Sequence, residues 1–147
     1  MEQGFIASIG KNNTFSEAVI VHFNSKIISV KDLIEIHLYT HKSTSNHSMR
    51  YKYRSAVYTF SAFQKEEVNT ILRNLQSEFD NPIITKVLPF RAFKPSIEQV
   101  TNYYYKNPDK PFCKSFIHPK LTLLLQKFSV HVNYCKINLK EPFYPIK

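Results

Sequence analysis

The segment Lys65–Phe79 constrains the fold most, because its apolar residues recur at the spacing of one face of an α-helix. That face consists of Val68, Ile71, Leu72, Leu75 and Phe79. Ser61 and Gln64 form a capping box ahead of the helix, and Asn81-Pro82 ends it. A helix with one apolar face buries that face against another element, so the remaining segments must supply the surface.

Patterns typical of strands precede this helix. Glu17–Phe23 is apolar and β-branched, and Asn24-Ser25 separates it from Lys26–Val30, which predicts a β-hairpin. Further along, Ser48–Phe60 predicts a long strand in which cations and tyrosines alternate before an apolar run. An antiparallel sheet in the first half of the chain follows from these two segments.

Residues 30–41 fit both a strand and a helix. In a strand, Ile34 and Leu38 face inward while charged and polar residues face out. In a helix, Ser29 is the N-cap and Asp32 completes a capping box, with the apolar residues on one face. We favour the strand and keep the helix as the alternative.

The second half of the chain mixes helices with strands. Ile83–Leu88 predicts a strand, and Ser96 caps a short helix. Pro119 suits the first turn of another helix, and Val130–Leu139 predicts a final strand. The predicted fold class is therefore α+β, as a single domain over 1–147 whose N-terminal antiparallel sheet packs with two to three short helices.

The charge of the chain is positive and unevenly distributed. Lys and Arg number 20 against 11 Asp and Glu, which gives a formal net charge of +9. Residues 81–147 carry a net charge of +8 and residues 49–64 carry +3, while residues 1–48 are neutral. A concentrated excess favours a surface that faces a polyanion, and charge that serves only solubility is the alternative.

Two sets of residues are candidates for nucleic-acid contacts. In the predicted strand Ser48–Phe60, the period of two places Arg50, Lys52 and Arg54 on one face. The second set combines cations for phosphate with aromatic rings for stacking on bases, and it consists of Tyr103, Tyr105, Lys106, Lys110, Lys114 and Lys120. Packing in the core is an equal alternative for the two tyrosines.

The sequence carries no motif that predicts catalysis. Two glycines are too few for a glycine-rich phosphate loop, and GxSxG, HExxH and paired acidic motifs do not occur. We therefore predict no catalytic residue, no enzymatic activity and no cofactor.

Two sets of residues have spacings found in metal sites, and we predict no metal at either. Cys113, His118, His131 and Cys135 follow intervals close to those of a zinc finger, but the order of ligands differs from that family. A strand over the last pair would separate it by about 13 Å. His37 and His41 have ligand spacing only if their segment is helical.

Two stretches resemble part of a known family. FRAFKPSIEQVTNYYYKNPDK and HPKLTLLL together span about a quarter of the chain and resemble the later part of a LAGLIDADG homing-endonuclease repeat. The acidic, glycine-containing helix that carries catalysis in that family has no match here. The resemblance therefore assigns no catalytic residue.

The location expected from the sequence is the cytoplasm. The N-terminal residues Met-Glu-Gln-Gly-Phe-Ile lack a basic start and a long apolar core, so no signal peptide is predicted. Aliphatic runs such as Leu123–Leu125 are far too short to span a membrane. Two cysteines without a CxxC motif fit a reducing compartment.

These observations lead to one functional expectation with two alternatives. We expect a small non-catalytic protein of a virus or mobile element that binds DNA or RNA, alone or in a nucleoprotein complex, mainly through phosphate contacts. The first alternative is an inhibitor that binds a host or rival nucleoprotein enzyme. A nuclease with an unrecognised site is the second. The oligomeric state is left open.

Overall fold

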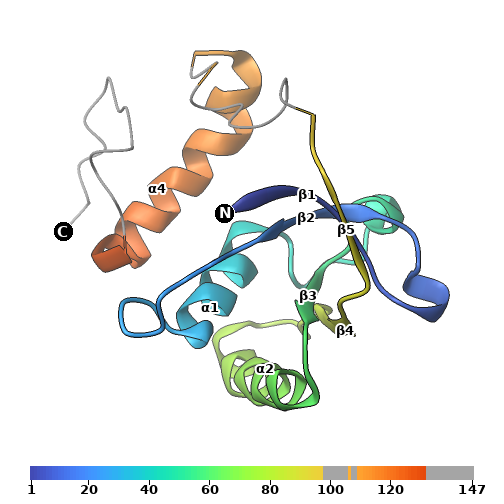
Figure 1. The fold of residues 1–147 in the computed structure, drawn as a ribbon. Helices are drawn as coiled ribbons and strands as arrows, with labels where there is room; N and C mark the ends of the chain where they lie inside the picture. Colours follow the sequence, from blue (N-terminus) through green and yellow to red (C-terminus); the bar gives the residue numbers. More distant parts are fainter. Residues whose placement is uncertain (98–105, 107–108, 132–147) are drawn as a thin grey trace. The chain divides into compact units, whose positions relative to one another are not determined.

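The computed structural model describes residues 1–97, 106 and 109–131, which belong to two compact units, Met1–Ser96 and Ile97–Lys147 (Figure 1). The first unit contains β1 (Glu2–Ala7), β2 (Ser16–Ile20), α1 (Val30–Thr40), β3 (Ala56–Thr59), α2 (Ala62–Leu75), β4 (Lys86–Pro89) and β5 (Ala92–Pro95). In the second unit, the described part contains a π-helix (Cys113–Ile117), α4 (His118–Lys127) and a 3₁₀ turn (Ser129–His131). The α+β class is confirmed, and the single-domain expectation stays a prediction.

The strands of the first unit form two small sheets. One has the order β2-β1-β5 with antiparallel neighbours, and the other pairs β3 with β4 in parallel. Gly4 lies in the central strand β1, where a Cβ atom would come within 2.3 Å of the Lys94 carbonyl oxygen on β5. Only glycine therefore permits this close approach of the two backbones.

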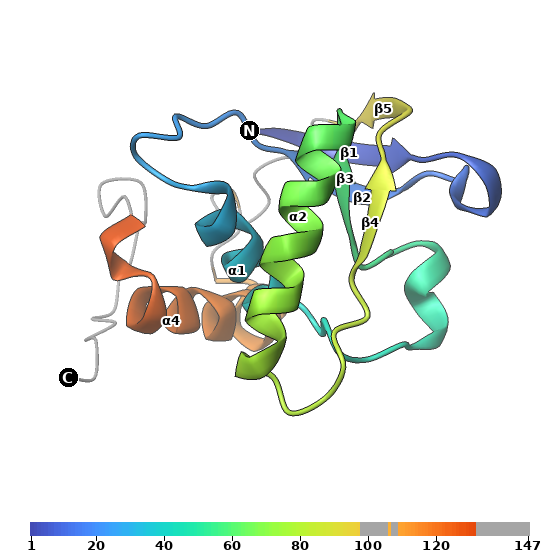
Figure 2. The same cartoon turned by 90° about the horizontal axis from the view of Figure 1, so that it is seen from below.

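The core of the first unit lies between its two helices and the parallel strand pair. Ile34 and Leu38 of α1 pack with Val68 and Leu75 of α2, and all four are at most 4% exposed. Figure 2 shows α2 lying along β3 and β4 with α1 beside it, in agreement with their contacts. The predicted stripe from Val68 to Leu75 is the face of α2 that this core buries. The helix ends at Leu75, before the predicted Phe79, which is extended and still packs against the core.

The favoured strand over residues 30–41 is wrong, and the helical alternative is confirmed. The Asp32 backbone N–H donates to Ser29 Oγ at 3.0 Å, and the Ser29 backbone N–H donates to Asp32 Oδ2 at 3.2 Å. These reciprocal bonds satisfy two backbone donors at the start of α1. The capping box and the helical apolar face together outweigh the strand pattern.

The predicted hairpin is also wrong, because β2 pairs with β1 instead of with Lys26–Val30. Asn24 starts a turn there: its carbonyl accepts from the Ile27 N–H at 2.9 Å, and its side chain accepts from the Lys26 N–H at 3.0 Å. Asparagine bonds to its own backbone in this way and stops extended pairing.

Several other elements agree with the sequence analysis. Ser61 caps α2 by accepting from the Gln64 N–H at 3.1 Å, and β4 overlaps the predicted strand Ile83–Leu88 but extends to Pro89. Pro119 lies in the first turn of α4. The predicted final strand is contradicted at its start, where Val130 lies in a 3₁₀ turn, and its remainder lies outside the described residues.

Of the helix predicted after Ser96, only the start at residues 96–97 and residue 106 belong to the described residues. The described helices include none that combines the length and apolar character needed to cross a membrane.

Candidate functional site

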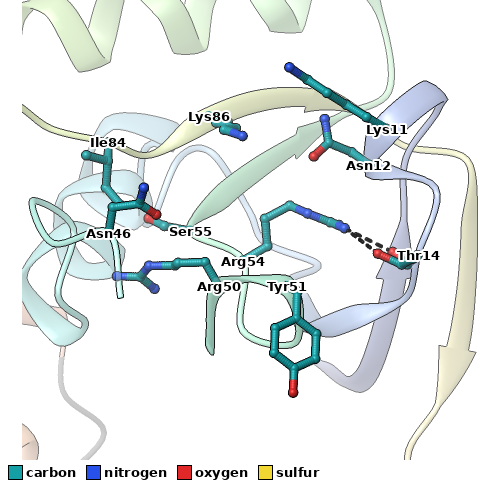
Figure 3. Close-up of a pocket in the computed structure, with 10 residues that line it drawn as sticks. All are labelled: Lys11, Asn12, Thr14, Asn46, Arg50, Tyr51, Arg54, Ser55, Ile84 and Lys86. Carbon is teal, nitrogen blue, oxygen red and sulfur yellow. Dashed lines mark hydrogen bonds between the residues drawn. The ribbon is translucent and has the colours of Figure 1, made fainter. Parts of the chain in front are cut away.

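A cleft of about 520 Å³, here called the basic cleft, opens in the first unit (Figure 3). Three segments line it: the connection between β1 and β2, the connection between α1 and β3, and the start of β4. Four cations lie along it, Lys11, Arg50, Arg54 and Lys86, and none of the described residues that line it is Asp or Glu. The cleft therefore has a positive potential.

Arg54 is held rigidly at the centre of the basic cleft. One guanidinium nitrogen donates to the Tyr58 hydroxyl at 2.9 Å, and another donates to the Thr14 side chain at 2.9 Å and to its carbonyl at 3.2 Å. The Arg54 backbone N–H donates to Ser16 Oγ at 2.7 Å. These bonds tie the connection after α1 to the β1–β2 sheet, as the dashed lines to Thr14 show in Figure 3.

Arg50 has neutral partners as well. Its guanidinium donates to the backbone carbonyls of Lys42, Ser45 and Tyr53. Burial away from water lowers the pKa of Arg50 from its usual value, as expected for a partly desolvated cation without a carboxylate partner. Arg50 therefore links backbone carbonyls within the connection between α1 and β3. These neutral partners leave its positive charge uncompensated.

The structure contradicts the predicted stripe of three cations on one strand. Residues Ser48–Tyr51 form a 3₁₀ turn, and β3 begins only at Ala56. Lys52 is exposed and lies over the Tyr53 ring at 5.2 Å, away from the basic cleft. Hydrogen bonds of Arg50 and Arg54 to loop backbone replace strand pairing here, and the alternation of cations and tyrosines does not reveal them.

Two lysines complete the basic cleft, and the sequence analysis missed both as site residues. Lys11 follows β1 and Lys86 starts β4, and both are exposed. In Figure 3 they lie on one side of Arg54, while Arg50 and Tyr51 lie on the other. No local pattern links Lys11 with Lys86, since only the tertiary fold brings these segments together.

A polar network lies beneath the cleft and joins α1 to β3 and β4. The His41 Nδ1–H donates to the His37 carbonyl, and His41 Nε2 lies 2.7 Å from Ser55 Oγ. Ser55 Oγ is also 2.8 Å from Thr85 Oγ1. Ser55 beside an oriented imidazole resembles an activated nucleophile, but its 3% exposure assigns the network a structural role.

His37 lies against His41 with the ring centroids 4.2 Å apart. The pKa of His37 is lowered to about 4, first by burial and then by the neighbouring His41 ring, while a hydrogen bond with the Ala56 carbonyl acts in the opposite direction. His37 is therefore neutral near pH 7. Although this segment is helical, both ring nitrogens of His41 have protein partners, which opposes metal binding.

The other set with metal-like spacing, which includes Cys113 and Cys135, belongs only partly to the described residues. Cys135 lies outside the described residues, while His118 and His131 lie at α4 and in the following turn. Among residues 1–97, 106 and 109–131, no three His, Cys, Asp or Glu side chains gather in a way that could hold a metal ion.

The second predicted nucleic-acid set belongs to the second unit. Tyr103 and Tyr105 lie outside the described residues. The four lysines of this set are exposed: Lys106, Lys110, Lys114 and Lys120. Nucleic-acid contact by any of them stays a prediction that the structure does not test.

An apolar groove of about 470 Å³ adjoins the basic cleft in the first unit. Side chains of β2, α1 and β3 line it, including Val19, Ile34 and Val57. Arg54 lines both this groove and the basic cleft. A ligand with a polar head and a short apolar tail would find both environments around one side chain.

Comparison with known proteins decides the family. The family model described as peptide methionine sulfoxide reductase matches residues 6–133. The chain belongs to the peptide methionine sulfoxide reductase family. A reductase MsrA of Acinetobacter baumannii is 30% identical over 117 residues, which cover 77% of this chain and 67% of that protein. MsrA of Trichodesmium erythraeum is 32% identical over 124 residues, covering 80% and 70% respectively.

Solved structures agree with this membership at the level of the fold. Mxr1 from Saccharomyces cerevisiae in reduced form is 21% identical with a TM-score of 0.63, over 76% of this chain and 73% of that one. An unusual oxidized form of Mxr1 gives a TM-score of 0.58 and 22% identity, over 75% and 66% respectively. The chain thus spans about two thirds of the length of the curated relatives described above.

Membership of this family corrects the functional expectations. The relatives are named as reductases, so a non-catalytic viral nucleic-acid-binding protein is the wrong conclusion, and so are the inhibitor and nuclease alternatives. The resemblance to a homing endonuclease fails for the same reason, because its residues lie within the matched 6–133. A nucleic-acid or nucleoprotein partner stays a prediction that no comparison tests.

Proposed function

We propose that this chain reduces methionine sulfoxide in peptides. The match of the reductase family model to residues 6–133 carries the proposal. The basic cleft supports it, because a sulfoxide oxygen accepts hydrogen bonds and the cleft offers ammonium donors from Lys11 and Lys86. The adjoining apolar groove suits the methyl and methylene groups of the same side chain.

The reaction requires two electrons, which a thiol can supply. A thiolate attacks the sulfoxide sulfur, and the oxygen passes to the cysteine sulfur, giving a thioether and a sulfenic acid. Methionine sulfur is reduced by two electrons and cysteine sulfur is oxidised by two. A second thiol then displaces the sulfenic oxygen as water and forms a disulfide.

The sequence restricts where the thiols of this chain can come from. Its two cysteines are Cys113 and Cys135, and residues 1–96, which contain the basic cleft, include none. In the proposal, these two cysteines supply the electrons. The cytoplasmic location belongs to the same proposal, because a reducing compartment keeps both thiols reduced.

The test is a reductase assay on a short peptide that contains methionine sulfoxide, with a dithiol as the external reductant. Wild type is expected to form methionine, and Cys113→Ser or Cys135→Ser is expected to lower the rate at least tenfold. If a single variant still forms one sulfenic acid per chain, the cysteine that it retains is the one that attacks the sulfoxide. Unchanged activity in the Cys113→Ser/Cys135→Ser double variant would contradict the assignment of the thiols.

A further inference from the structure

We infer that the basic cleft selects methionine sulfoxide residues with carboxylate side chains beside them in the peptide. This inference rests on the proposed function and names its class of substrate. It starts from the four cations of the cleft, which no described carboxylate neutralises.

The two arginines act as fixed positive charges. The guanidinium of Arg54 is bonded to a hydroxyl, a second hydroxyl and a carbonyl, and that of Arg50 is bonded to three carbonyls. All these partners are neutral oxygens, so they orient the groups and remove none of their charge. Because most donors of Arg50 are occupied, it attracts an anion by its charge instead of by paired hydrogen bonds.

The two lysines supply the free donors. Lys11 and Lys86 are exposed and form no ion pair with a described carboxylate. Each ammonium has three donors on a long stem, which suits contact with a carboxylate whose position varies between peptides. Figure 3 draws both on the same side of Arg54, and all three line one cleft, so an anion that enters the cleft is attracted by all three charges.

Two other cations of the first unit, Lys31 and Lys52, have acidic groups nearby. Lys31 Nζ lies 3.9 Å from Glu35 Oε2 on α1. The pKa of Lys52 is raised mainly by Tyr53, and Glu17 adds a smaller effect in the same direction. The basic cleft lacks such compensation, so attraction of an external carboxylate is not weakened by an internal one. A volume of about 520 Å³ fits a few peptide residues, which agrees with a carboxylate adjacent to the sulfoxide.

The experiment uses four labelled peptides in two pairs. Methionine sulfoxide or methionine stands at the centre, and either Glu or Gln flanks it on both sides. Binding to the full chain is measured by fluorescence anisotropy at low ionic strength and at high salt. The Glu sulfoxide peptide is expected to bind about three- to tenfold more tightly than its Gln counterpart at low ionic strength, with the difference shrinking in salt.

Variants then locate the preference. The Lys11→Gln/Lys86→Gln double variant is expected to lose most of it, while Lys26→Gln/Lys65→Gln, which removes the same charge from exposed lysines outside the cleft, is expected to retain it. Equal binding of Glu and Gln peptides to wild type, or no binding of any peptide, would overturn the inference. So would a preference that persists after loss of Lys11 and Lys86.

The same peptides separate this inference from the function on which it rests. If Glu peptides are preferred whether they contain the sulfoxide or the thioether, the cleft binds acidic peptides and sulfoxide recognition is contradicted. If the sulfoxide is reduced equally fast in Glu and Gln peptides, and both bind equally, the proposed function stands and the inference fails.

Discussion

The core between α1 and α2 and the basic cleft are organised by different interactions. The core is held by apolar side chains that repeat at helical spacing, such as Leu38 and Val68, each 1% exposed. The cleft is shaped by arginine side chains that bond loop backbone up to 40 residues away, as Arg54 does with Thr14. Local periodicity therefore specifies the first region, and long-range hydrogen bonds specify the second.

The largest effect is expected in the core. Leu38→Ala should lower the free energy of unfolding by about 2–5 kcal/mol, because it leaves a cavity where the wild-type side chain is fully packed. Leu72→Ala is the matched control: Leu72 lies at the margin of the same core, so its loss should cost less. Urea unfolding measures both, and equal stability of Leu38→Ala and wild type would place the core elsewhere.

The polar network under the cleft should make stability depend on pH. The pKa of His37 is about 4 in the folded state against 6.5 for the ordinary group, so the unfolded chain takes up the proton first as pH falls. Its contribution is complete above about pH 6.5 and is lost towards pH 4, by about 3 kcal/mol at most.

Urea unfolding at several pH values checks this effect against His37→Gln, which cannot titrate. Carboxylates also titrate near pH 4, and the difference between the two proteins removes their contribution. An identical pH dependence of wild type and variant between pH 6.5 and 4 would show that burial of His37 does not control the effect.

A smaller effect is expected from the arginine at the centre of the cleft. Arg54→Gln removes its hydrogen bonds to Thr14 and Tyr58 and should cost about 1–3 kcal/mol. Lys52→Gln, two residues away and exposed, should change stability by less than about 0.5 kcal/mol. Thermal melts of the two variants are the measurement. Equal decreases in melting temperature would show that Arg54 contributes no more to stability than the exposed Lys52.

The smallest effect on stability is expected from the two lysines of the cleft. Lys11→Gln/Lys86→Gln should change the free energy of unfolding by less than about 0.5 kcal/mol, since both side chains are exposed. Chemical denaturation of this double variant is the measurement. A loss above 2 kcal/mol would mean that these lysines, like Arg54, support the fold.

The sequence predicts elements whose evidence is local. The cap of α2, its stripe from Val68 to Leu75, and Pro119 at the start of α4 are encoded within a few residues, and the structure has them as predicted. For residues 30–41 the capping box of Ser29 and Asp32 was the deciding signal, and the alternation of apolar residues received too much weight.

The cleft could not be predicted in the same way. Lys11 and Lys86 belong to segments that are far apart in the sequence. The end of β1, which precedes Lys11, pairs with β5, and β5 is only four residues long, so its sequence pattern is weak. Arg50 and Arg54 were recognised as candidates, but alternation suggested a strand where loop carbonyls hold them. The family was not recognised from residue patterns because no motif considered in the sequence analysis is characteristic of it.

The most direct test of the proposed reductase activity is a single turnover without external reductant. Fully reduced protein is mixed with excess methionine sulfoxide peptide, and mass spectrometry quantifies methionine while free thiols are counted. The account predicts up to one methionine per chain together with the loss of two thiols, because one sulfenic acid resolves into one disulfide. No methionine formed, or methionine formed while both thiols remain free, would contradict it.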